Sequence, residues 1–248
     1  TLILKEGANT IAAFIAEPIT GASGVIVPPA GYYQKGQALL NQHDILFWAD
    51  EVITGFGRTG NDFGCTTMGI NSPDMMTLAK QLSSAYLPIS AAAIRGDMYQ
   101  AMIEPSASLG VFGHGYTYSG HPLACAVALK NFQKLQARIQ SGKLEQTIRY
   151  FGEKIQSHFS RHPNVHGLRQ TGLTASIELG PRPGEPDWKI DDRTGWQICL
   201  AARHNELLLR PLGDSLLIVP PLIISNQEID FLCERLLHTL QSVLGSHA

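Results

Sequence analysis

Four short apolar runs in the first part of the chain constrain its fold more than any other feature. They are IAAFIAEP (11–18), ILFWADEV (45–52), MMTLAK (75–80) and ISAAAI (89–94). The runs lack the polar–apolar alternation of a strand with one face in water, and segments with helical spacing lie between them. The pattern therefore predicts an α/β fold with a parallel or mixed sheet that is covered on both faces.

The second half of the chain has a different pattern. Helical stretches at 121–139 and 142–162 are followed by two short strands within 165–179 and a loop at 181–192. A helix, the strands LLLRPLG and SLLIVPP, and a closing amphipathic helix follow. We therefore predict two domains. Residues 1–135 would be part of a larger α/β domain, and residues 136–248 a smaller α+β domain.

Composition excludes several classes of function. The 248 residues are 44% hydrophobic and 16% charged, which favours a packed core over disorder. The net charge of -2, without a basic block, argues against a nucleic-acid partner. No apolar run is long enough to span a bilayer, and the first residues lack the layout of a signal peptide. We expect a cytoplasmic enzyme with no membrane partner and four buried thiols, Cys65, Cys125, Cys199 and Cys233.

Charged residues stand at the ends of three of the apolar runs. Glu17, Asp50 and Lys80 would meet where ligands bind in α/β sheets, beyond the carboxyl ends of the strands. Asp50 is either a helix cap or structural ion pair, or an acid that pairs with a ligand. Lys80 either extends to solvent past small neighbours or is a desolvated amine with a lowered pKa, as Schiff-base chemistry requires.

Two further segments carry polar groups. The loop GHGYTYSGHP (113–122) offers hydroxyl and backbone donors that suit a phosphate. Its histidines, His114 and His121, lack a carboxylate or cysteine at ligand spacing, so we expect no metal site. Arg210 lies between apolar strand residues and needs an anionic partner, either a substrate carboxylate or a structural acid such as Asp214.

These signals occur together in a recognisable order. The segments AFIAEPI, GVIVPPAGY, FWADEVITGFGRTG, PDMMTLAKQLSSAYLPIS, HGYTYSGHPLACAVAL and LLLRPLGDSLLIVPPL together resemble class III aminotransferases, which are pyridoxal 5'-phosphate (PLP) enzymes of the aspartate aminotransferase fold, also called fold type I. YTYSGHP is most similar to ω-amino acid or amine:pyruvate transaminases. RPLGD followed by PP is also similar to diaminopelargonate synthase.

The resemblance implies catalytic roles for two residues. Lys80 corresponds to the lysine that forms the internal aldimine and moves the proton during the reaction. Asp50 corresponds to the acid that keeps the pyridinium nitrogen protonated, so that the ring accepts electrons. The implied activity is transamination of an amine or ω-amino acid with a keto acid such as pyruvate.

The resemblance also implies binding roles. Val52 corresponds to the residue that packs on one ring face of the cofactor. Thr117, with Tyr116 beside it, corresponds to the hydroxyl that reaches the cofactor phosphate across the interface of a homodimer. Arg210 corresponds to the arginine that binds the carboxylate of the amino acceptor. Glu17 corresponds to an acid that supports the residues in contact with the ligand.

Some positions depart from the family pattern. Ala22 replaces a glutamate of ornithine and γ-aminobutyrate transaminases, which favours the ω-transaminase group. Gln81 follows the lysine where the family usually has glycine, and glycine is also common at Ala85 and Gln170.

The chain is also much shorter than members of the family, so it resembles only their C-terminal part. The phosphate-cradling loop and the aromatic that stacks on the cofactor ring have no counterpart here. The predicted large domain would therefore be a partial PLP-binding domain with an incomplete sheet. The alternatives are a catalytically impaired fragment derived from an aminotransferase, or another class III member such as diaminopelargonate synthase, a racemase or an aminomutase.

Overall fold

The computed structural model describes residues 2–245, which form two compact units. Unit 1 contains the chain up to residue 19, residues 28–56 and residues 61–137. Unit 2 contains residues 20–27, residues 57–60 and the chain from residue 138 onward. Two short segments from the first half of the sequence therefore belong to unit 2. A single division of the chain at residue 135 places both segments in the first domain instead.

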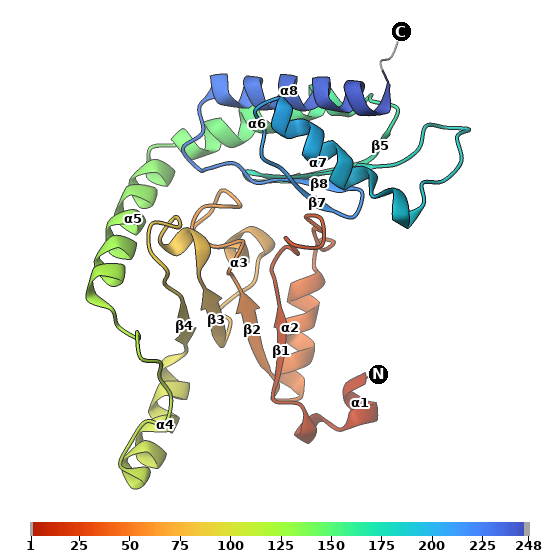
Figure 1. Cartoon of the computed structure of the whole chain (residues 1–248). Coiled ribbons are helices and arrows are strands. Elements are labelled where there is room, and N and C mark those ends of the chain that lie inside the picture. Colours follow the sequence, from red (N-terminus) through yellow and green to blue (C-terminus); the bar gives the residue numbers. More distant parts are fainter. Residues whose placement is uncertain (1, 246–248) are drawn as a thin grey trace. The chain divides into compact units, whose positions relative to one another are not determined.

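Unit 1 is built on a four-stranded mixed sheet (Figure 1). The strands lie in the order in which they occur in the sequence: β1 (Ala13–Ala16), β2 (Leu46–Asp50), β3 (Met75–Leu78) and β4 (Ala91–Ile94). The first three strands are parallel, and β4 pairs antiparallel with β3. All four coincide with the apolar runs of the sequence, and the mixed sheet agrees with the predicted α/β class.

The helices of unit 1 include several that the apolar pattern does not mark. The elements are α1 (Leu2–Glu6), η1 (Ala8–Thr10), α2 (Tyr32–Gln42), α3 (Gly64–Met68), η2 (Lys80–Leu82), α4 (Gly96–Leu109) and most of α5 (Pro122–Gln140). The apolar pattern of the sequence predicts no helix for α4, which contains Pro105 and buries none of its residues. Without a buried face, the segment has no strong helical periodicity to detect.

The two faces of this sheet differ in burial. Phe47 and Ala49 of β2 pack on one face against side chains of α2 and α3, among them Tyr33 and Cys65. Successive strand residues alternate between faces, so Trp48 and Asp50 lie on the other face, and both are only half-buried. In the described residues, deep burial is therefore confined to one face of a sheet that was expected to be covered on both.

Unit 2 has an antiparallel sheet with strand order β5-β6-β8-β7. Its elements are α6 (Lys143–Phe159), β5 (Val165–Thr171), β6 (Thr174–Leu179), η3 (Ile190–Asp192), α7 (Thr194–His204), β7 (Arg210–Leu212), β8 (Ser215–Ile218) and α8 (Asn226–Leu244). Helices α6, α7 and α8 lie on one side of the sheet (Figure 1). The side chains between them are fully buried and include Phe151, Ile177, Ile198, Leu216 and Leu236.

Two short segments belong to unit 2 because hydrogen bonds hold them there. Arg58 is 8% exposed, and its Nη1 donates to the carbonyl oxygens of Leu173 (2.8 Å) and Pro220 (2.7 Å). Burial lowers the pKa of Arg58 to about 10. Arg169 Nε donates to the carbonyl of Gly24 at 2.7 Å. The glycine-rich stretch TGFGRTG (54–60) thus contains a buried structural arginine, Arg58.

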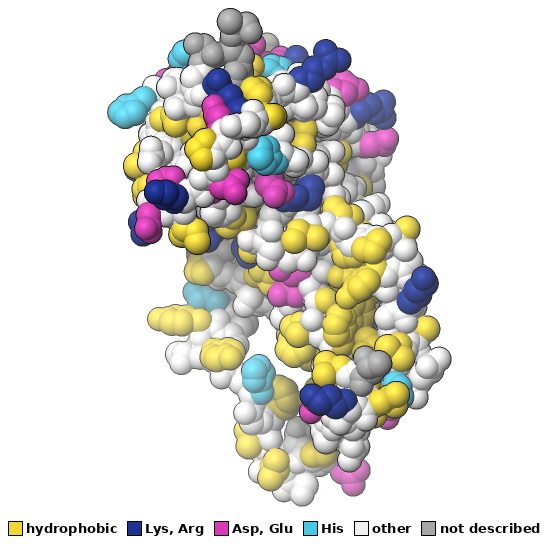
Figure 2. Space-filling model, turned by 90° about the vertical axis from the view of Figure 1, so that its right-hand side faces the viewer, with side chains coloured by type: hydrophobic (Ala, Val, Ile, Leu, Met, Phe, Trp, Pro, Cys, Tyr) yellow, Lys and Arg dark blue, Asp and Glu magenta, His cyan; other side chains and the backbone are white. Residues whose placement is uncertain are grey.

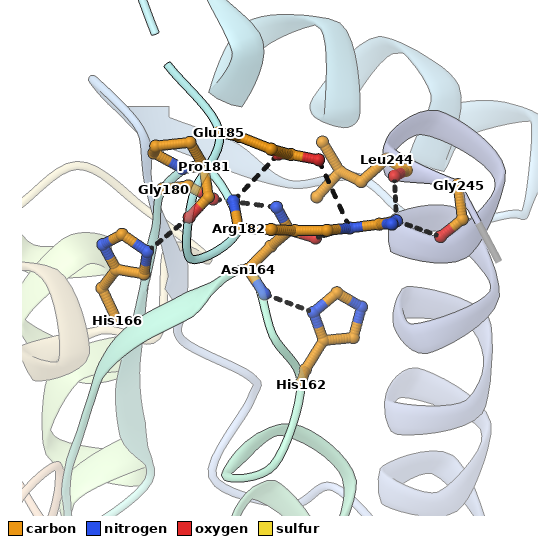
Figure 3. A network of polar contacts seen from close by, with 9 residues as sticks. All are labelled: His162, Asn164, His166, Gly180, Pro181, Arg182, Glu185, Leu244 and Gly245. Atoms are coloured by element: carbon orange, nitrogen blue, oxygen red, sulfur yellow. Dashed lines mark hydrogen bonds and ion pairs between the residues drawn. The ribbon is translucent and has the colours of Figure 1, made fainter. Parts of the chain in front are cut away.

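Both ends of α8 have hydrogen-bonded caps. At its start, Ser225 and Glu228 form a capping box, in which Ser225 Oγ accepts from the Glu228 N–H at 3.2 Å. At its end, Arg182 Nη2 donates to the carbonyl oxygens of Leu244 (2.6 Å) and Gly245 (3.1 Å), as Figure 3 shows. A cation at a helix C-terminus also interacts favourably with the helix dipole. These contacts anchor the loop after β6 to the closing helix.

Three of the four cysteines are buried, but Cys125 is exposed on α5. The expectation of four buried thiols is therefore wrong at this position, because Cys125 lies on a face of the helix that no described residue covers. Burial raises the pKa of Cys199 to about 11 and that of Cys233 to about 12, which makes both thiols poor nucleophiles.

Candidate active site

The carboxyl ends of β1, β2 and β3 bring the predicted acid and lysine to one edge of the unit 1 sheet. Asp50 is the last residue of β2 and pairs in register with Thr77 of β3. Lys80 follows β3 directly and begins η2, while Glu17 follows β1. Because the three strands are parallel, these ends meet at the same edge, as the sequence analysis expected for all three residues.

Asp50 is half-buried and carries a carboxylate with few protein partners. Its Oδ1 accepts the backbone N–H of Val52 at 3.1 Å. Within residues 2–245 it forms no ion pair, so the structural ion pair considered for it is not present in the described chain. The hydroxyl of its register partner Thr77 is buried and has no hydrogen-bond partner among the described residues. A half-buried acid beside an unsatisfied hydroxyl can accept a hydrogen bond from a cationic or N–H group of a ligand.

The side chain of Lys80 is exposed, and its backbone is unusual. Its φ angle is +42°, in the left-handed region that few non-glycine residues adopt. No described residue forms an ion pair with its ammonium group. Left-handed backbone in a non-glycine residue persists where the surroundings hold it, and such positions are frequent at functional sites. The amine is therefore accessible and is held on a constrained backbone.

Glu51, the residue after Asp50, is a feature that the sequence analysis did not single out. It is completely buried, and its carboxylate accepts from Thr54 Oγ1 (2.6 Å) and from the N–H groups of Gly64 (2.9 Å) and Cys65 (2.6 Å). A Cβ on Gly64 would lie only 2.6 Å from Thr54 Cβ, so this packing requires glycine. Glu51 thus ties the end of β2 to the start of α3. Its signal in the sequence was the pair of acids that closes the second apolar run.

The segment that contains Tyr116 and Thr117 is exposed throughout. Tyr116 is 78% exposed, and its N–H donates to Ser119 Oγ at 3.0 Å within a turn. In the described residues, no hydrogen bond links this segment to Asp50 or Lys80. The structure therefore brings Asp50, Val52 and Lys80 to one edge, and leaves Tyr116 and Thr117 on an outward-facing turn.

Arg210 belongs to unit 2 and opens the short strand β7. It is exposed, and it forms no ion pair with the described residues. The structural partner considered for it, Asp214, instead accepts the N–H of Gly195 at 3.0 Å. The guanidinium group is consequently available for an anion.

Two kinds of feature are absent from residues 2–245. No cluster of three or more His, Cys, Asp or Glu side chains with the arrangement of a metal site was found there. None of the helices in the same range is both long and apolar enough to cross a membrane.

Comparison with solved structures defines the fold. A structure described as "Transaminase with L-ala" superposes with a TM-score of 0.90 at 40% sequence identity, covering 98% of this chain and 57% of that one. The omega transaminase from Pseudomonas jessenii in complex with PMP gives a TM-score of 0.89 at 40% identity, covering 99% of this chain and 55% of that chain. The fold is therefore that of the PLP-dependent transaminases, fold type I, and this chain contains part of it.

The family follows from the sequence. The model of the family described as "Aminotransferase class-III" matches residues 1–240. The chain belongs to the class-III aminotransferase family, whose members use PLP, and the predicted family and fold class are confirmed.

The names of the relatives refer to different substrates. Gamma aminobutyrate transaminase 3 of Solanum lycopersicum is 44% identical over 234 residues, which cover 92% of this chain and 44% of the relative. Diaminobutyrate–2-oxoglutarate transaminase of Halomonas elongata is 38% identical and is covered to 50%. Vanillin aminotransferase of Capsicum frutescens is 41% identical, also covered to 50%. This chain spans about half the length of the curated relatives it matches.

Proposed function

We propose that this chain contributes Lys80 and Asp50 to a PLP-dependent active site that transfers an amino group from an amine or ω-amino acid to a keto acid such as pyruvate. The observation that supports this most is the position of the two residues at the carboxyl ends of neighbouring parallel strands. An acid and a primary amine at that edge are the two groups that PLP chemistry requires from a protein.

The residues of unit 1 fit the cofactor. When bound, PLP supplies an aldehyde that condenses with amines and a ring that accepts electrons. Asp50 has a carboxylate without an ion-pair partner in the described chain, and it would hold the ring nitrogen in its protonated form. Lys80 would bind the aldehyde carbon through its exposed amine and move a proton at that position. Val52, half-buried beside Asp50, would pack against the ring.

The remaining ligand contacts would come from a partner subunit and from a residue of unit 2. Thr117, with Tyr116 beside it, would reach the cofactor phosphate of a partner subunit in a homodimer, and the exposure of this segment is compatible with that role. Arg210 would bind the substrate carboxylate. Residues 1–135 would then act as part of the cofactor-binding domain, and residues 136–248 as the small domain.

Trapping of the PLP adduct with borohydride tests the proposal directly. The chain is titrated with PLP, reduced with borohydride and digested, and the modified lysine is located by mass spectrometry. We expect the adduct on Lys80, its loss in Lys80→Ala, and its retention in the control variant Lys130→Ala, which removes an exposed lysine of α5. An adduct that persists unchanged in Lys80→Ala contradicts the proposal.

A second candidate function is a catalytically impaired domain derived from an aminotransferase. One observation favours it: Lys80 is exposed rather than desolvated. The same titration separates the two functions, because an impaired domain would form no adduct at micromolar PLP. If an adduct forms, a panel of amines with pyruvate distinguishes transaminase activity from that of a racemase or aminomutase, since only transamination consumes the keto acid.

A further inference from the structure

The loop that begins at Lys80 contains three residues in the left-handed region. The φ angles are +42° for Lys80, +50° for Ser84 and +62° for Ala85. Each such conformation is unfavourable for a residue with a Cβ and persists only where surrounding contacts hold it. The loop therefore needs an external support to keep the backbone of Lys80 in place.

One side chain of α5 provides that support. Asn131 Nδ2 donates to the carbonyl oxygens of Gln81 (2.7 Å) and Leu82 (3.1 Å). Its Oδ1 accepts from Ser84 Oγ at 2.7 Å, and Ser84 Oγ in turn accepts from Gln81 Nε2 at 2.6 Å. Asn131 is half-buried and uses both kinds of group in its amide, two N–H donors and one oxygen acceptor.

We propose that Asn131 is a positioning residue for Lys80: it clamps the carbonyl groups of Gln81 and Leu82, the two residues after the lysine, and so sets the direction in which the amine points. The inference rests on the proposed function of Lys80, because a direction matters only if the amine reacts. The clamp reaches across about fifty residues of sequence but lies entirely within unit 1.

The clamp also gives Gln81 a role. The family usually has glycine at this position, yet Gln81 is not one of the left-handed residues of this loop. The Gln81 side chain instead completes the hydrogen-bonded ring through Ser84. A glycine there could not donate to Ser84, so in this chain the loop is held by side-chain contacts.

The variant Asn131→Asp tests the clamp with almost no change in shape. It replaces the donating nitrogen with an oxygen that would face two carbonyl oxygens, while Ser84 can still donate to the other oxygen. We expect amide hydrogen exchange of residues 81–85 to accelerate about tenfold, since a lost hydrogen bond in a part-buried site changes a local equilibrium by that order. We also expect the rate of borohydride trapping of PLP at Lys80 to fall about tenfold relative to other lysines.

Gln136→Glu is the matched control. Gln136 is another amide of α5, and its Nε2 donates to Asp62 Oδ1 at 2.7 Å, away from the Lys80 loop. This variant should leave exchange at 81–85 and trapping at Lys80 within about twofold of the original chain. Ser84→Ala removes the hydroxyl that donates to Asn131 Oδ1 and accepts from Gln81 Nε2, but it leaves the two hydrogen bonds of Asn131 Nδ2 in place. It serves if Asn131→Asp does not fold, and it should accelerate exchange of the same residues by a smaller factor.

The outcomes separate this inference from the proposed function. If Asn131→Asp and Ser84→Ala both leave the exchange of residues 81–85 unchanged, the clamp is wrong, whatever PLP does. If exchange accelerates but trapping at Lys80 keeps its rate, the clamp exists without positioning the amine, which also overturns the inference. If the original chain forms its adduct elsewhere than on Lys80, the proposed function fails, and so does the positioning role that depends on it.

Discussion

The two sheets of this chain differ in how completely they are covered. In unit 2, Phe151, Ile177 and Leu216 are fully buried between the antiparallel sheet and its helices. In unit 1, β4 carries three exposed alanines, and Phe14 and Ile15 of β1 are 36% and 55% exposed. Unit 2 thus has a closed core, whereas the sheet of unit 1 has one deeply buried face.

Exposed apolar surface is concentrated on unit 1. Figure 2 shows hydrophobic side chains gathered on the side formed by α1, β1 and α2. Residues of these elements, including Ile3, Phe14, Tyr32 and Leu39, line an open apolar hollow of about 380 Å³. The candidate Lys80 and Asp50 therefore lie on the less covered of the two sheets. Because local stability follows buried apolar contact, we expect unit 1 to open more readily than unit 2.

The largest expected effect comes from the core of unit 2. Phe151→Ala should lower the free energy of unfolding of this unit by about 3–5 kcal/mol, because it removes a fully buried ring and leaves a cavity. Phe14→Ala in unit 1 should cost far less, since the ring is already 36% exposed. Hydrogen exchange measured separately for the two units checks both values. Equal losses would show that the difference in burial does not translate into stability.

The next effect concerns the C-terminus of α8. Arg182→Ala should destabilise unit 2 by about 1 kcal/mol, because the carbonyl oxygens of Leu244 and Gly245 lose their donor and the helix dipole loses its cation. Amide exchange in the last turn of α8 is the measurement. Arg149→Ala is the control, since Arg149 forms only an exposed pair with Glu145 and should change little. An unchanged last turn in Arg182→Ala would show that the cap contributes nothing.

A stabilising change is expected in unit 1. Ala85 has a φ angle of +62°, so Ala85→Gly should raise the local free energy of unfolding by about 0.5–1 kcal/mol. The matched control is Ala91→Gly, an exposed alanine in the extended strand β4, where glycine should instead destabilise. Thermal unfolding of both variants gives the comparison. Destabilisation by both substitutions would contradict the left-handed geometry of the loop.

The smallest effect is a change in how steeply the free energy of unfolding declines with pH above about pH 10. Burial raises the pKa of Tyr33 to about 12, and the Tyr33 hydroxyl donates to the carbonyl of Glu17. The folded state therefore keeps this proton at pH values where the unfolded state has lost it. Its contribution to stability is complete below about pH 10 and declines as the pH rises toward 12.

In Tyr33→Phe the free energy of unfolding should therefore decline less steeply as the pH rises. Urea unfolding at pH values from about 8 to about 11 measures this slope. Tyr32→Phe, at a neighbouring exposed tyrosine, is the control. Identical slopes for the original chain and Tyr33→Phe would show that Tyr33 is not the group responsible.

Sequence patterns located the elements with strong apolar signals and missed those without them. The run at 45–52 became β2, with Asp50 at its end, because its apolar residues need burial and Phe47 and Trp48 have high β-propensity. Helix α4 escaped notice because it buries no residue. The assignment of residues 57–60 to unit 2 could not be read from the sequence either, since it depends on Arg58 reaching the carbonyls of Leu173 and Pro220.

The sequence by itself determined the family, the α/β class and the order of acid and lysine along the chain, because short-range apolar patterns and motif spacing are properties of neighbouring residues. Tertiary structure decided what depends on distant partners. It buried Glu51 against the start of α3, and it placed Asn131 against the loop of Lys80. Hydrogen bonds between residues fifty positions apart leave no periodic signal, so only the folded chain shows which amide holds the loop after the lysine.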